Sequence, residues 1–366
     1  MRDATRVLRA GLPDAVQGEP FLPGPAFAAT FHLAGDPASS PYSYGRYHNP
    51  SWTLFEQALG ELEGGHAVVF PSGMAAITAL FTAVLQRGGV LVMPSDGYYT
   101  ARLLAEDQLR KEGVEVRLVP TRDGVDYESL NGAALLLMET PSNPGLDVCD
   151  ISLLAAMGHE RGLLVAVDNT TATALGQRPL ELGADFSVAS DTKALSGHGD
   201  VVLGHVAVRD GQWAEKLRAW RTRTGCIPGP MEVWLAHRSL ATFDVRMERQ
   251  CLNALTVASF LEMHPAVHAV RYPGLPGDPA HVLASRQMKR YGSVIGFTLR
   301  DRPHAERFLS SCSIVSQATS FGGVHTTAER RARWGGDAVP EAYIRLSIGC
   351  EDAQDLVDDL SHALQA

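Results

Sequence analysis

Short apolar segments alternate with helical segments over the first two thirds of the chain, and this alternation limits the folds that the chain can adopt. The segments predicted to be strands are residues 67–70, 90–93, 114–119, 135–138 and 163–167. The segments between them that are predicted to be helices are residues 72–85, 99–111 and 151–161. Short apolar strands separated by helices are typical of a mostly parallel sheet that is buried on both faces. The predicted fold class is therefore α/β.

The pattern changes at both ends of this region. Residues 1–50 are rich in proline, glycine and aromatic residues and lack a helical period, which predicts an extended arm that must pack on another surface to be ordered. Residues 231–263 contain neither proline nor glycine and are predicted to form one long helix. Short strands and helices follow it. We therefore expect an arm over 1–50, an α/β domain over 51–230, and a long helix with a smaller α+β domain over 231–366.

The net charge of the chain excludes some classes of function. A formal charge of -9 argues against a nucleic-acid-binding protein, which needs a basic face for phosphate contacts. No apolar run reaches membrane-spanning length, and the first residues contain no apolar signal core. We therefore expect a protein that binds neither nucleic acid nor membrane.

The cysteines and histidines point to a reducing compartment and to no metal. The 5 cysteines are widely spaced without a Cys-x-x-Cys pair, a pattern typical of free thiols. His264 and His268 stand four residues apart, but Pro265 between them disfavours a shared helix face, and no third ligand is near in sequence. We expect a cytoplasmic location and no metal site.

Lys193 and Asp168 are the residues that most directly indicate chemistry. Lys193 follows a strand-like segment, 185–189, and Asp168 directly follows the predicted strand 163–167. A lysine that forms a Schiff base with an aldehyde and an aspartate that holds a pyridinium nitrogen are the two anchors of pyridoxal 5′-phosphate (PLP). The hydroxyls of Ser190 and Thr192 flank the lysine and can bond a phosphate. These residues predict a PLP site.

Other loops follow predicted strands and are expected at the same edge of the sheet, where ligands of parallel sheets gather. Gly73 and Met74 open a helix, whose free N–H groups bind phosphate, and Gly73 permits close approach. Tyr98 can stack on a flat cofactor ring. The polar, proline-rich loop 139–144 follows another strand, and such loops are often functional.

With these segments the chain resembles the Cys/Met-metabolism family of PLP enzymes, and within it the bacterial cystathionine γ-lyases. The matching segments are YGRYHNPS (44–51), SGMAA (72–76), ETPSNP (139–144), VDNT (167–170), SDTK (190–193), GHGDV (197–201), YPGLP (272–276) and RLSIGCED (345–352). They occur in the family's order and cover nearly the whole chain. The resemblance implies the PLP-dependent transferase fold type I (aspartate aminotransferase-like), with the PLP-binding domain at 51–230.

The resemblance also implies roles for residues around the cofactor. Lys193 carries PLP and then moves protons between the substrate Cα and the cofactor. Asp168 keeps the pyridine nitrogen protonated, and Tyr98 stacks on the ring and activates the incoming amine. The residues implied to hold the phosphate are Gly73, Met74, Ser190 and Thr192, joined by Tyr44 and Arg46 from the neighbouring subunit.

For the substrate, the resemblance implies that Arg345 clamps the α-carboxylate, for which a guanidinium is well shaped. Asn143 and Ser320 assist near that carboxylate and the cofactor O3′. Glu139 is expected to support Asn143 or the Lys193 loop.

Several positions depart from the family pattern. Asp191 stands where a small residue is more usual, so its charge must point away from the phosphate or pair. Thr319 stands where animal and yeast γ-lyases carry Glu, which leaves substrate preference open. Tyr98 is not followed by the cysteine of methionine γ-lyases, which disfavours that activity. The basic segment 330–333 is a candidate for the distal end of the substrate site, but plain surface is the favoured interpretation.

The resemblance implies γ-elimination of L-cystathionine to L-cysteine, 2-oxobutanoate and ammonia, a trans-sulfuration reaction. The alternatives are cystathionine γ-synthase, which replaces the acyl group of an activated homoserine, and less so cystathionine β-lyase or methionine γ-lyase. A PLP-holding binding protein is disfavoured by Arg345, which a pure binder does not need. The arm and the shared phosphate site imply a homotetramer, a dimer of dimers with shared active sites.

Overall fold

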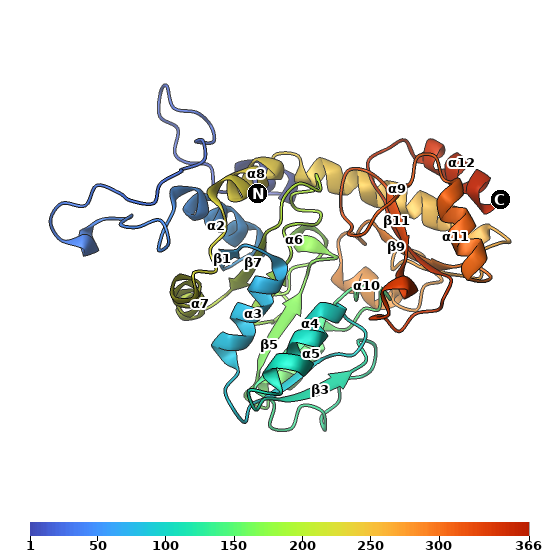
Figure 1. The fold of residues 1–366 in the computed structure, drawn as a ribbon, viewed down its shortest axis with the longest axis horizontal. Helices are drawn as coiled ribbons and strands as arrows, with labels where there is room; N and C mark the ends of the chain where they lie inside the picture. Colours follow the sequence, from blue (N-terminus) through green and yellow to red (C-terminus); the bar gives the residue numbers. More distant parts are fainter. Residues whose placement is uncertain (366) are drawn as a thin grey trace.

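The computed structural model describes residues 1–365. Two sheets lie at opposite ends of the long helix α9 (Phe243–Met263), and the N-terminal segment runs away from the body of the molecule (Figure 1). Among the described residues, no helix is both long and apolar enough to cross a lipid bilayer.

The larger sheet has the strand order β1-β7-β6-β5-β4-β2-β3. Its strands are β1 (His66–Phe70), β2 (Val90–Pro94), β3 (Glu115–Val119), β4 (Leu135–Glu139), β5 (Leu164–Asp168), β6 (Phe186–Ala189) and β7 (Gly204–Val208). Neighbours from β6 to β3 pair in parallel, and β7 runs antiparallel to both β6 and β1. The expectation of a mostly parallel sheet is confirmed. Strand β7 was not predicted, because it begins with the weak strand formers Gly204 and His205.

Helices cover both faces of this sheet, which explains its nearly continuous apolar strands. Leu91 and Met93 pack with α3 (Gly73–Val84), α4 (Tyr99–Leu104) and α7 (Gly211–Thr224) on one face. Val92, between them, faces α5 (Ile151–His159) on the other. Helix α2 (Pro50–Glu63) and the short α6 (Thr173–Gly176) extend this second layer.

Two helix predictions were wrong in detail. The segment 231–263 forms α8 (Pro230–Leu240) and α9 rather than one helix. The chain turns at Thr242, whose φ of -117° is not helical, and Arg246 donates to the carbonyl of Ser239 at 3.1 Å. This bond satisfies one of the carbonyls that the end of α8 leaves free.

The other correction concerns the first residues of the arm. A helix, α1 (Asp3–Arg9), forms where none was predicted. Val7 and Ala10 are buried with residues of α2, and Asp3 pairs with Arg178. Tertiary packing therefore orders a segment that is too short to be helical alone.

The smaller sheet has the order β10-β11-β12-β9-β8. Its strands are β8 (Ala269–Arg271), β9 (Val294–Thr298), β10 (Ser316–Gln317), β11 (Thr327–Arg330) and β12 (Tyr343–Ser347). Helices α9, α11 (Arg302–Ser311) and α12 (Ala353–Leu364) bury one face of it. Helix α10 (His281–Gln287) contributes Ala284 to a small apolar cluster with Val148 and Ala172. In the central strand β12, Arg345 stands opposite Glu329 of β11.

Candidate active site

A cavity of about 400 Å³ lies where the carboxyl ends of the parallel strands meet the smaller sheet. It is lined from the large sheet by the loops after β1, β2, β4, β5 and β6, and from the small sheet by residues of β12 and the segment after β10. The predicted site residues that it brings together are Gly73, Met74, Tyr98, Asn143, Asp168, Ser190, Thr192, Lys193, Ser320 and Arg345.

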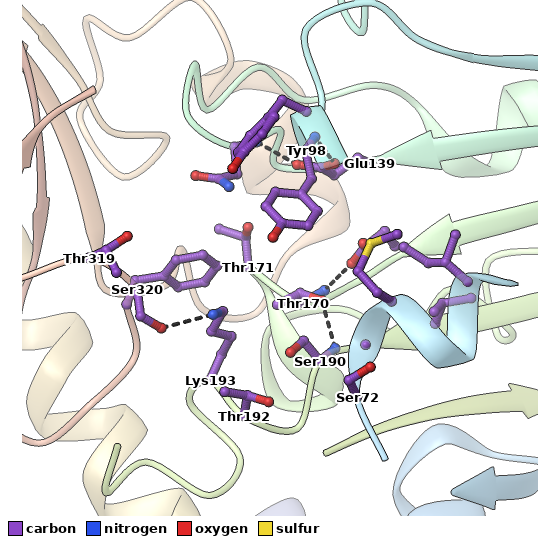
Figure 2. A pocket seen from close by; sticks show the side chains of 18 of the residues that line it. Ser72, Tyr98, Glu139, Thr170, Thr171, Ser190, Thr192, Lys193, Thr319 and Ser320 are labelled. Atoms are coloured by element: carbon purple, nitrogen blue, oxygen red, sulfur yellow. Dashed lines mark hydrogen bonds between the residues drawn. The ribbon is translucent and has the colours of Figure 1, made fainter. Parts of the chain in front are cut away.

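Lys193 enters the cavity from the turn after β6 (Figure 2). Its backbone N–H donates to the carbonyl of Ser190 at 3.1 Å, and its amine donates to the hydroxyl of Ser320 at 2.8 Å. Burial, aided by the positive charge of Arg345, lowers the pKa of Lys193 to about 8. About a tenth of this amine is therefore neutral at pH 7, far more than for an ordinary lysine, and the neutral form is the one that a nucleophile or a base requires.

Asp168 ends β5, is buried and lines the cavity. One carboxylate oxygen accepts the N–H of Thr170 at 3.0 Å. Burial raises the pKa of Asp168, and the Thr170 bonds and the charge of Lys193 oppose that rise. A cation beside Asp168, such as a protonated ring nitrogen, would offset the cost of burying the carboxylate.

The part of the cavity formed by the start of α3 and the 190–193 loop is suited to a phosphate. Ser72 caps α3 by accepting the N–H of Ala75 at 3.0 Å, which leaves the first-turn N–H groups of Gly73 and Met74 without helical partners. A Cβ at Gly73 would lie 2.8 Å from the Cβ of Ser190, so only glycine allows the two loops to approach this closely.

The two hydroxyls that flank Lys193 differ in their bonding. The hydroxyl of Thr192 donates to the carbonyl of Leu203 at 3.1 Å and accepts the N–H of Leu203 at 3.0 Å. The backbone N–H of Ser190 donates to the hydroxyl of Thr170 at 2.9 Å, and the Ser190 hydroxyl lines the cavity. Of the two hydroxyls predicted to bind phosphate, that of Ser190 is thus the more available.

Glu139 holds the loops that carry Tyr98 and Asn143. It accepts the backbone N–H groups of these two residues, each at 2.6 Å. Burial, and then the negative charge of Asp168, raises the pKa of Glu139 well above its usual value. Of its two expected roles, the bonds agree with support of Asn143. The ring of Tyr98 points into the cavity (Figure 2).

Arg345 is fixed by partners from both sheets. It donates to the side-chain oxygen of Asn143 at 2.6 Å and to the carbonyl of Ser320 at 3.1 Å, and it pairs with the buried Glu329. Burial lowers the pKa of Arg345 to about 10, so it remains a cation at neutral pH. It can therefore receive a carboxylate in a defined orientation.

Glu329 was missed by the sequence analysis. It lies opposite Arg345 in the register of β11 and β12 and also accepts from Arg331 and Trp334, each at 2.8 Å. Burial opposes its charge, but Arg345 and these donors lower the pKa of Glu329 overall. The sequence did contain a signal for Glu329, because a lone carboxylate that stands beside the arginines of segment 330–333 is well placed to pair with them.

Arg331 corrects the interpretation of segment 330–333 as plain surface. It is buried, pairs with Glu329 and Asp337, and lines the cavity. Thr319 lines it too and donates to Glu329 at 3.3 Å.

Tyr44 and Arg46 do not line the cavity of their own chain. Arg46 donates to the carbonyl of Thr222 at 2.8 Å, and its guanidinium lies 5.5 Å from the centre of the Tyr44 ring. Tyr44 is 40% exposed. Their placement in a neighbouring subunit's site stays a prediction.

No group of three or more His, Cys, Asp or Glu side chains within residues 1–365 could hold a metal ion.

Asp191, in contrast to the flanking hydroxyls, is turned away from the cavity and is bonded to His205. It therefore both points away and pairs, as its charge requires.

A lysine after a strand, a buried aspartate and a helix N-terminus around one cavity of an α/β fold define a PLP-dependent enzyme of fold type I. The chain belongs to the Cys/Met metabolism PLP-dependent enzyme family, whose model matches residues 26–365.

Relatives cover the chain from end to end. It is 58% identical to "Putative cystathionine gamma-lyase" of Streptomyces coelicolor, over 99% of this chain and 93% of that protein. It is 35% identical to the cystathionine gamma-lyase of Sus scrofa, over 99% of this chain and 93% of that protein. The structure of cystathionine gamma synthase from Xanthomonas oryzae pv. oryzae in complex with cystathionine superposes with a TM-score of 0.94, at 32% identity over 100% of this chain and 98% of that one. These findings indicate a PLP-dependent carbon–sulfur lyase or transferase of amino-acid metabolism.

Proposed function

We propose that this protein catalyses the γ-elimination of L-cystathionine, which consumes water and yields L-cysteine, 2-oxobutanoate and ammonia. The observation that carries the proposed chemistry at the substrate Cα, which the alternative reactions share, is that Ser320 lies between Lys193 and Arg345. Its hydroxyl accepts from Lys193 at 2.8 Å and its carbonyl from Arg345 at 3.1 Å. An amino acid whose α-carboxylate binds Arg345 therefore presents its Cα beside the Lys193 amine.

When bound, PLP supplies an electron sink for the carbanion that forms at Cα. Gly73, Met74 and Ser190 would hold its phosphate, Asp168 its ring nitrogen and Tyr98 its ring face. Asp168, being buried, is suited to keeping that nitrogen protonated.

Lys193 removes the proton from the substrate Cα, which Arg345 and Asn143 keep in place through the carboxylate. Loss of a second proton from Cβ then allows the thiolate at Cγ to leave as cysteine. Hydrolysis of the remaining four-carbon unit gives 2-oxobutanoate and ammonia. The 58% identity to the Streptomyces protein supports this reaction over the others of the family.

The second candidate is the γ-synthase reaction, in which cysteine replaces the acyl group of an activated homoserine. The likeness to the Xanthomonas synthase, with a TM-score of 0.94, favours it as the alternative. Both reactions use the same proton transfers at Cα and Cβ, so Lys193 and Arg345 serve them equally.

We also propose that the active form is a homotetramer, built as a dimer of dimers. The arm exposes large apolar side chains, with Phe21 88% and Phe27 70% exposed, which a partner surface would cover. In this arrangement Tyr44 and Arg46 complete the phosphate site of the neighbouring subunit.

Identification of the keto acid tests the reaction. L-cystathionine is incubated with the purified holoenzyme and the products are separated by chromatography. We expect 2-oxobutanoate with an equal amount of cysteine. Pyruvate and homocysteine would instead show cleavage on the other side of sulfur and reject the γ-lyase proposal. Cystathionine formed from an acylated homoserine and cysteine, with little cleavage, would favour the synthase.

A further inference from the structure

A buried ionic cluster lies directly behind the lysine loop. Asp191 accepts a hydrogen bond from Nδ1 of His205 at 2.7 Å, and Nε2 of His205 lies 3.4 Å from the carboxylate of Glu63. Asp191 and His205 are each 1% exposed and Glu63 is 2% exposed. We call these three residues the Glu63–His205–Asp191 cluster.

The cluster joins helix α2 and strand β7 to the 190–193 loop, which lines the cofactor cavity. Glu63 is the last residue of α2, and His205 lies on β7, where it pairs in register with Val69 of β1 and Ala189 of β6. Asp191 stands between Ser190 and Thr192, which line the cavity. The side chain of Asp191 lies behind the loop, so the residues on either side of it are turned toward the cofactor.

Strand β7 and the residue before it contact both segments that are expected to hold the phosphate: the start of α3 and the 190–193 loop. At Gly204 a Cβ would lie 2.6 Å from the Cα of Gly73, so the strand contacts the start of α3 directly. Leu203, just before the strand, bonds the hydroxyl of Thr192 through both its N–H and its carbonyl. His205 then fixes Asp191 in the same loop.

The charges of the cluster hold it together. Burial opposes a charge on His205, but Asp191 and then Glu63 raise its pKa to about 10, so the ring is a cation at neutral pH. One oxygen of Asp191, one of Glu63 and Nε2 of His205 are buried without a hydrogen-bond partner among the described residues, so Glu63 contacts His205 as an ion pair at 3.4 Å. Removing the cation would leave two buried carboxylates facing each other, which is costly.

We propose that Glu63, His205 and Asp191 are positioning residues for the cofactor: they fix the 190–193 backbone against β7, so that Ser190 faces the start of α3 and Lys193 faces Ser320. This goes beyond the proposed reaction and does not depend on which carbon–sulfur bond is cleaved. The cluster acts through the loop and touches neither substrate nor cofactor.

The test measures how tightly PLP binds to the cofactor-free protein, by absorbance titration, in Asp191→Ala, His205→Ala and the double variant. Each single change should raise the PLP dissociation constant at least about tenfold, because it leaves a buried charge without its partner. The dissociation constant of the double variant should not exceed the larger of the two single-variant values, since the two residues act as one unit.

The matched control is Asp359→Asn. Asp359 is buried in the smaller domain and accepts the N–H groups of residues 313–315, far from the loop. This change should lower Tm but leave the PLP dissociation constant within about twofold. Visible circular dichroism at saturating PLP separates positioning from stability. The signal should change in the cluster variants and stay unchanged in Asp359→Asn.

Asp191→Asn and Glu63→Gln keep the shape of the buried side chains, so they replace the alanine variants in the PLP titration if those do not fold. Both should weaken PLP binding severalfold, because they remove charge from the cluster. Wild-type PLP affinity and an unchanged dichroism signal in folded cluster variants would overturn the inference. So would an equal loss of PLP affinity in Asp359→Asn.

Discussion

The amine of Lys193 donates a 2.8 Å hydrogen bond to the hydroxyl of Ser320, and this bond joins the large sheet to the small one. Ser320 has a φ of +79°, a conformation rare for residues other than glycine. Its carbonyl also accepts from Arg345. A strained residue thus sits between the proposed base and the proposed carboxylate clamp, where the surrounding bonds hold it in place.

The first prediction concerns Lys193. The Lys193→Ala protein should fold, show no covalently bound PLP, and lose turnover by on the order of 10³-fold or more, because both the attachment point and the base are gone. Mass spectrometry after borohydride reduction checks the covalent link, and a steady-state assay checks the rate. Wild-type turnover by this variant would reject the assignment of Lys193.

The second prediction concerns pH. The neutral amine of Lys193 is the form that attacks an aldehyde, and its pKa is lowered to about 8 by burial and by Arg345. The rate constant for PLP uptake by the cofactor-free protein should therefore rise with pH up to about 8 and level off above it. Stopped-flow absorbance across pH 6 to 10, at roughly constant ionic strength, measures this profile. A rise that continues toward the usual lysine pKa would contradict it.

The third prediction concerns Arg345. Arg345→Lys keeps the charge but loses the planar pair of donors, so the KM for amino-acid substrates should rise roughly 10- to 100-fold. Arg333→Lys is the matched control. Arg333 pairs with the same Glu329 at 3.1 Å but is not among the residues that line the cavity. Its KM should stay within about twofold of the wild type. An equal rise in both variants would assign the effect to Glu329 and not to carboxylate binding.

The site residues whose position could be predicted from the sequence are those that lie just after a predicted strand. Lys193 and Asp168 follow apolar strands, and in a parallel sheet such ends meet at one edge, so their meeting was predictable. Glu329 and His205 were not, because their roles depend on strand pairing between distant segments. The break at Thr242 was also hidden, since the residues around it carry no glycine or proline and only the bonds of Arg246 reveal the turn.

The last prediction concerns the arm. In a single chain Arg46 bonds Thr222 and lies outside the cavity, although the family resemblance assigns it to a neighbouring phosphate site. If it acts in trans, mixing inactive Arg46→Ala with inactive Lys193→Ala restores one site in each hybrid dimer. That site takes Lys193 from one chain and Arg46 from the other. Equal, random reassociation should recover about a quarter of wild-type activity.

The matched control for this experiment mixes Lys193→Ala with Asp168→Ala. Both residues line the cavity of the same chain, so no hybrid dimer holds an intact site and activity should stay at background. Native mass spectrometry confirms that hybrids form in both mixtures. If hybrids of the Arg46→Ala pair are present and their activity does not exceed that of the control, Arg46 acts within its own chain or not at all.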